Sequence, residues 1–70
     1  MTNTELLNEL IKQSGLKKNH IAKELGISPF ALAKKIRNEN EFKSSEISRL
    51  CELLQISSLK QKELIFFAEG

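Results

Sequence analysis

The segment LKKNHIAKELGISPFALAKKI, residues 16–36, consists of helix-forming residues that are interrupted by Gly26 and Pro29. Gly26 can adopt a positive φ, which ends a helix and turns the chain sharply. Ser28 suits the N-cap of a new helix, and Pro29 suits its first position because proline fixes φ and lacks an N–H. We therefore predict two short helices, over about 18–25 and about 29–37, on either side of this turn.

Similar local signals predict three further helices and no long strand. The first has Thr4 as N-cap and ends at Gly15, and the fourth covers about 44–54. The last opens with the capping-box pattern Ser58-Leu59-Lys60-Gln61 and runs to about Phe67, although its final Ile-Phe-Phe also suits a short strand. The apolar residues expected to face the core are Leu6, Leu7, Leu10, Ile11, Ile21, Ala22, Leu25, Ile47, Leu50, Cys51 and Leu54. The predicted fold is all-α, a compact bundle of about five short helices.

Length and composition indicate one small intracellular domain, residues 1–70. The hydrophobic fraction of 40% and the charged fraction of 29% are ordinary for a globular protein. No apolar run reaches the roughly 18–20 residues that span a bilayer, and the first residues, MTNTELL, do not resemble a secretory signal. The single cysteine, Cys51, can form no internal disulfide and fits a reducing compartment. We therefore expect a cytoplasmic protein with no membrane association.

The basic charge is concentrated in the middle of the chain. The net charge is only +2, yet residues 12–43 carry eight lysines and arginines against three glutamates, a net charge of +5. Both flanking segments are mildly acidic. This asymmetry suggests an anionic partner for the middle segment, and a solvated lysine-rich surface is the alternative.

Residues on both sides of the turn have the pattern of a helix-turn-helix over about 18–37. Ala22 is small where the second helix must approach closely, and Ile27 is expected to plug the turn into the core. Leu32 and Ile36 supply the apolar stripe of the second helix. The spacing therefore predicts two helices of about two turns each that meet across a very short connection.

This pattern resembles the helix-turn-helix of the Cro/lambda-repressor-like (XRE family) regulators, and the whole chain is similar to short phage-type members of that family. The matching residues are Ile21, Ala22, Leu25, Gly26, Ile27, Ser28, Leu32, Lys35, Ile36, Phe42, Glu46, Ile47, Leu50, Cys51, Leu54 and Ile56. Two positions depart from the pattern. Lys18 stands where glutamine often opens the first helix of the motif, and Pro29 occupies a recognition-helix position usually held by a polar residue.

The resemblance implies a lambda-repressor-like DNA-binding fold and a transcriptional regulator of phage or prophage type, acting in a bacterial or phage-infected cell. It implies a double-stranded DNA operator as partner, with the second helix of the motif in the major groove, and no enzymatic activity or cofactor. Because one motif of this size offers little affinity alone, a homodimer on a pseudo-palindromic site is expected. Residues Ile65, Phe66 and Phe67 are the expected dimer surface, and completing the core is their alternative use.

A helical wheel at about 100° per residue separates two faces of the segment 29–37. Leu32 and Ile36 lie on the core side, whereas Phe30 and Arg37 lie on the other. In the resembling family the outer face and the N-terminal part of this helix contact bases, which implies the following base contacts: Ser28, Pro29, Phe30, Ala33, Lys34 and Arg37. We expect Phe30 to pack on a thymine methyl group. The alternative is a lid over the gap between the two helices.

The remaining polar residues near the motif are read as phosphate contacts, which give affinity without sequence information. They are Lys17, Lys18, Asn38 and Lys43. For each lysine a solvated surface is an equal alternative, and Lys23 and Lys35 are expected to serve solubility alone.

A second function class remains open, a protein-interaction modulator such as an antirepressor or antitoxin that uses the same fold to bind another regulator. Its support is the modest net charge together with the apolar pair Pro29-Phe30 at the start of the recognition helix. Metal and enzyme chemistry find no support, because His20 has no second histidine and Cys51 has no nearby base.

Overall fold

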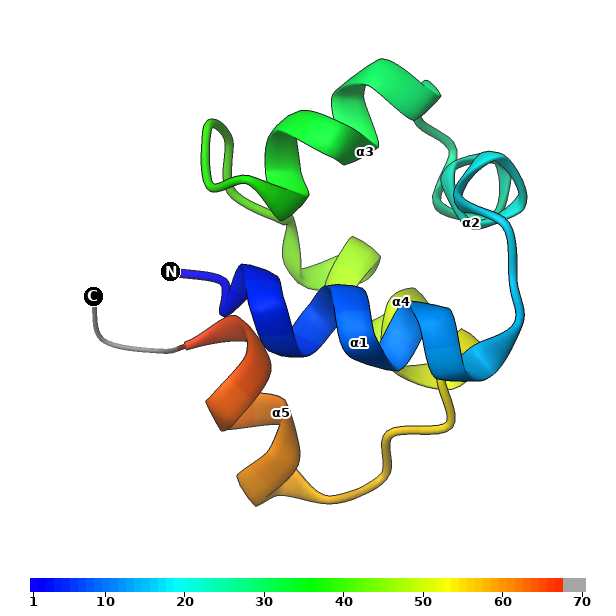
Figure 1. Ribbon diagram of the computed structural model, residues 1–70. Coiled ribbons are helices and arrows are strands. Elements are labelled where there is room, and N and C mark those ends of the chain that lie inside the picture. Colours follow the sequence, from blue (N-terminus) through cyan, green and yellow to red (C-terminus); the bar gives the residue numbers. More distant parts are fainter. Residues whose placement is uncertain (68–70) are drawn as a thin grey trace.

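The computed structural model describes residues 1–67 and confirms the all-α fold class. Within that range the elements are α1 (Thr4–Ser14), α2 (Lys18–Leu25), α3 (Pro29–Ile36), α4 (Ser44–Leu53) and α5 (Leu59–Phe66). The C-terminal Ile-Phe-Phe belongs to α5 and to the residue that follows it, so the strand alternative is wrong. In Figure 1, α3 lies across the top of the molecule, α1 crosses its centre and α5 lies at the bottom.

Helices α1 to α4 are each followed by a residue with a left-handed backbone, Gly15 in the case of α1, and three of these residues share a further motif. These residues are Gly26 after α2, Asn38 after α3 and Gln55 after α4. In each case this residue and the next donate their backbone N–H groups to carbonyls of the last helical turn. The motif satisfies carbonyls that would otherwise lack partners and directs the chain away from the helix axis.

The first helix begins one residue earlier than the sequence predicts. Its N-cap is Asn3, whose side-chain oxygen accepts from the backbone N–H of Leu6 at 3.1 Å. The predicted cap, Thr4, lies inside the helix and donates its hydroxyl to the carbonyl of Ile36. Asn and Thr are both good caps, so local propensity does not distinguish them, and the contact with α3 decides the choice.

Every helix contributes to one hydrophobic core. Its buried members are Leu7, Ile11, Ile21, Ala22, Leu32, Ile36, Phe42, Ile47, Leu50, Cys51, Ile65 and Phe66. Four residues predicted to face the core, Leu6, Leu10, Leu25 and Leu54, are half-buried at the margin of this cluster. Phe42, in the loop before α4, packs edge-to-face on Phe66 with ring centroids 5.8 Å apart. The loop after α3 is thereby anchored to the C-terminal helix.

Candidate nucleic-acid interface

The turn between α2 and α3 has the predicted geometry. Gly26 has φ +74°, and Ile27 donates its N–H to the carbonyl of Ala22 at 3.0 Å. Ser28 caps α3 by accepting from the N–H of Ala31 at 3.0 Å, and Pro29 occupies the first helical position. Residues 18–36 therefore form two short helices joined by a tight turn, and the second helix starts at Pro29.

The two faces of α3 differ as the helical wheel predicts. Leu32 and Ile36 are buried against the rest of the molecule, where α3 packs on α2 and α1. On the opposite face Phe30 is 68% exposed, and the Lys34 ammonium lies 5.2 Å from the centre of its ring. With so much of its surface in solvent, Phe30 does not act as a lid between α2 and α3. Ala33 is half-buried beside this face.

Arg37 follows the last residue of α3 and is exposed. Its Nε donates to Oε2 of Glu39 at 2.7 Å, and the two side chains are 56% and 49% exposed. An ion pair in this setting contributes little to stability, because water screens both charges. The Arg37 guanidinium can therefore exchange its hydrogen bond with Glu39 for one with another acceptor at little cost in free energy.

Lys35 does not face solvent, contrary to the solubility role predicted for it. Its ammonium lies 2.5 Å from Oε1 of Glu46 on α4, and the two side chains are only 10% and 8% exposed. The same Glu46 oxygen accepts from the backbone N–H of Lys43 at 2.8 Å and so caps the start of α4. Burial raises the pKa of Glu46, but these hydrogen bonds outweigh burial and hold the pKa below its ordinary value of 4.5.

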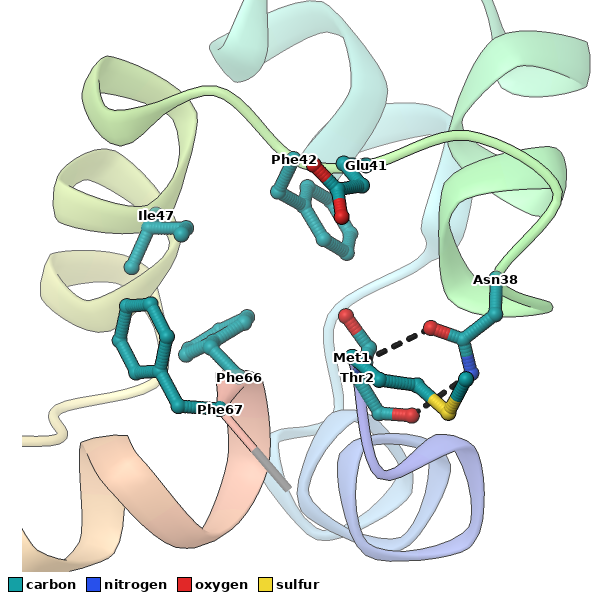
Figure 2. Close-up of a pocket in the computed structure, with 8 residues that line it drawn as sticks. All are labelled: Met1, Thr2, Asn38, Glu41, Phe42, Ile47, Phe66 and Phe67. Atoms are coloured by element: carbon teal, nitrogen blue, oxygen red, sulfur yellow. Dashed lines mark hydrogen bonds between the residues drawn. The ribbon is translucent and has the colours of Figure 1, made fainter. Parts of the chain in front are cut away.

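Asn38, a predicted phosphate contact, is exposed, but its side-chain amide is hydrogen-bonded to the N-terminal residues of the same chain. The amide oxygen accepts from the backbone N–H of Thr2 at 2.7 Å, and the amide nitrogen donates to the Thr2 carbonyl at 2.7 Å. Figure 2 shows both bonds between the chain end and the loop after α3. Its backbone has φ +66°, a conformation that asparagine tolerates better than most residues.

The predicted phosphate-binding lysines lie at helix starts. Lys17 is the N-cap residue of α2 and Lys18 its first helical residue, and both are exposed. Lys43 is the exposed N-cap residue of α4. Neither these three lysines nor Lys34 forms an ion pair with a carboxylate within residues 1–67. Each ammonium group is therefore available to an anionic partner.

The predicted dimer surface is divided by the structure. Ile65 and Phe66 are buried in the core, so they have the alternative use that the sequence left open. Phe67 is exposed, as is Leu64 one turn earlier on α5. Sequence reasoning missed Leu64 because α5 has apolar residues on both faces and therefore gives a weak periodic signal.

Other kinds of site find no counterpart in residues 1–67. No group of three His, Cys, Asp or Glu side chains there is arranged to hold a metal ion. None of the helices in this range has the length and apolar character needed to cross a membrane. A cavity of about 170 Å³ lies between the N-terminal residues and the aromatic residues Phe42, Phe66 and Phe67 (Figure 2).

Comparisons with protein-family models, with curated proteins and with solved structures gave no match. The function is therefore argued from the residues of this chain and their arrangement.

Proposed function

We propose that the protein is a sequence-specific DNA-binding transcriptional regulator of phage or prophage type, with α3 seated in the major groove of an operator. The observation that carries this proposal is the outer face of α3. It combines an exposed aromatic ring with two cations, while the inner face is held by buried residues. A protruding helix with that combination suits a groove lined by thymine methyl groups, base acceptors and phosphates.

The base contacts follow from the order of residues along α3. Phe30, near the N-terminal end, is placed to pack on a thymine methyl group, and half-buried Ala33 allows the helix backbone to approach the bases. Lys34 and Arg37, one and two turns later, supply donors for guanine or phosphate. Binding DNA would cost Arg37 only its ion pair with exposed Glu39, which contributes little to stability.

Affinity that does not depend on sequence comes from Lys17, Lys18 and Lys43. The first two stand at the N-terminus of α2, where backbone N–H groups reinforce the attraction of a phosphate. With Lys34, about four cations per protomer neutralise phosphates. Affinity is then expected to fall about 100-fold per protomer between 50 and 200 mM salt.

A homodimer completes the proposed regulator, since two half-sites give the affinity that one small motif lacks. The residues proposed for it are Leu64 on α5 and Phe67 directly after α5, and both expose apolar surface. In Figure 1, α5 lies on the opposite side of the molecule from α3, so pairing through α5 leaves the DNA-binding face free.

Selection of bound sequences from random DNA, followed by fluorescence anisotropy at several salt concentrations, tests the proposal. Phe30→Ala is expected to reduce the preference for the selected sequence, as is replacement of thymidine by deoxyuridine, which removes only the methyl group. Lys17→Ala is expected to weaken all sequences alike, and Lys23→Ala, on the same helix, serves as the matched control. Absence of affinity at low salt would refute the proposal.

A second candidate function is binding to another regulator through the same face. It is favoured by Phe30, because an aromatic side chain that is 68% exposed next to Pro29 forms an apolar projection suited to a protein groove. Co-purification with a protein partner that is lost in Phe30→Ala, together with no DNA affinity, would favour this function over the first.

A further inference from the structure

Residues 2–4, here called the N-terminal strap, join the ends of two helices that are far apart in the sequence. At the end of α3, Thr2 is bonded twice to Asn38, and the Thr4 hydroxyl donates to the carbonyl of Ile36. At the end of α5, the carbonyl of Ile65 accepts from the backbone N–H of Asn3 at 2.6 Å. The strap therefore ties the C-terminal end of α3 to the body of the molecule.

The side chain of Asn38 is the central part of this attachment. Its left-handed backbone ends α3: Asn38 donates its N–H to Lys35, and Glu39 donates to Lys34. Glycine would suit that backbone equally well, but only asparagine adds an amide that matches the N–H and the carbonyl of Thr2 together. The residue thus combines a helix end with a two-bond clamp.

The attachment matters because α3 has support on one face only. Its outer face, with Phe30, is turned to solvent, whereas Leu32 and Ile36 pack into the core and buried Lys35 pairs with Glu46 of α4. Within the strap, Thr2 lines the cavity of about 170 Å³ and so borders open space on that side. Figure 2 shows Asn38 and Thr2 on the right of this space, Phe66 and Phe67 on the left, and Phe42 above them. Hydrogen bonds are therefore a major part of what holds the end of α3.

We propose that Asn38 is a positioning residue for base reading rather than a phosphate contact. Through Thr2 it holds the last turn of α3, and with it Lys34 and Arg37, at a fixed distance and angle from the DNA. This inference rests on the proposed DNA-binding function. It predicts that the clamp affects discrimination between sequences while leaving the attraction to phosphates unchanged.

The test compares Asn38→Gly with the wild type, because glycine keeps the left-handed backbone and removes only the amide. The ratio of affinities for the selected operator and for random DNA is expected to fall about five- to tenfold, the worth of the lost hydrogen bonds. The salt dependence and the affinity for random DNA are expected to stay unchanged. Asn40→Gly, in the same exposed loop, is the matched control.

A second variant, Thr4→Val, removes the hydroxyl that donates to the carbonyl of Ile36 and accepts from Nδ2 of Asn38 at 3.4 Å. It is expected to reduce discrimination in the same way, although its hydroxyl is engaged inside the molecule and not with phosphate. Equal weakening of all sequences by Asn38→Gly, or a changed salt dependence, would show that Asn38 is a phosphate contact and would overturn the proposal. Unchanged discrimination in both variants would overturn it as well.

Amide hydrogen exchange separates failure of this inference from failure of the proposed function. In Asn38→Gly the N–H groups of Arg37 and Glu39, which close the last turn of α3, are expected to exchange about five- to tenfold faster. Exchange at the wild-type rate would refute the clamp whatever the DNA result. Faster exchange in a protein whose wild type binds no DNA would establish the clamp and refute the reading role together with the proposed function.

Discussion

The buried pair of Lys35 and Glu46 gives the sharpest prediction about stability. Glu46→Ala removes the oxygen that accepts from both the Lys35 ammonium and the Lys43 backbone. Removing one partner of a fully buried pair costs about 3–5 kcal/mol, and the side chains here are 10% and 8% exposed, so we expect about 2–4 kcal/mol. Domains of this size have a total stability of about 4–10 kcal/mol. The expected fall in Tm is about 8–32 °C, at about 4–8 °C per kcal/mol for a domain of this size.

Urea unfolding followed by circular dichroism measures the loss, provided that the m-value is unchanged. Glu46→Gln keeps an acceptor for the Lys43 N–H and is expected to cost about 1–2 kcal/mol, less than Glu46→Ala. Lys35→Met removes the charge and keeps most of the apolar stem. In a double-mutant cycle of Lys35→Met and Glu46→Gln, we expect a coupling free energy of about 1 kcal/mol or more.

The exposed pair of Arg37 and Glu39 provides the matched control in the same chain. Its side chains are 56% and 49% exposed, so Arg37→Ala is expected to change the unfolding free energy by less than about 0.5 kcal/mol. If Glu46→Ala costs no more than this control, burial does not strengthen the inner pair, and the reasoning is refuted. Additive single variants in the cycle would lead to the same conclusion.

Three further predictions follow from single groups. Folding lowers the pKa of Glu46, so its carboxylate stabilises the folded state fully above the unfolded pKa near 4.5. That stabilisation is lost as the pH falls through the folded pKa. The difference in the free energy of unfolding in urea between wild type and Glu46→Gln should therefore shrink on acidification. Gly26→Ala should lower the free energy of unfolding in urea by about 1–2 kcal/mol, because alanine is strained at a φ of +74°. An added Cβ meets no atom within 4 Å, so a much larger loss would contradict the absence of a steric clash. Burial raises the pKa of the Cys51 thiol, so a thiol reagent at pH 8 should react with it only after urea is added; prompt reaction in the folded protein would contradict its burial.

The helix boundaries were largely predictable because the signals that set them are local. Gly15 and Gly26 end helices through a positive φ, and Ser28 with Pro29 starts one, each within a few residues of its hydrogen-bond partners. The two faces of α3 were likewise predictable, since periodicity places Phe30 nearly opposite Leu32 in any α-helix. The start of α1 was predicted one residue late, because the sequence offers two capping residues in a row.

The less predictable part of the candidate site depends on partners that are distant in sequence. Lys35 has the composition of a surface residue, and its burial follows from a carboxylate 11 residues away on α4. Asn38 meets a backbone group 36 residues away, so no local pattern reveals the clamp. In the sequence alone, nothing distinguishes these two side chains from the exposed lysines and asparagines near them.

Local physical chemistry thus accounts for where the helices begin and end and for the residues that α3 presents to solvent. Packing of the helices accounts for which polar groups become structural and which of the C-terminal apolar residues remain exposed. Ile65 and Phe66 follow Leu64 directly in the sequence, yet only Leu64 faces solvent, because α5 lies against α1 along one side. Burial is a property of two surfaces in contact, and each surface comes from a different part of the chain.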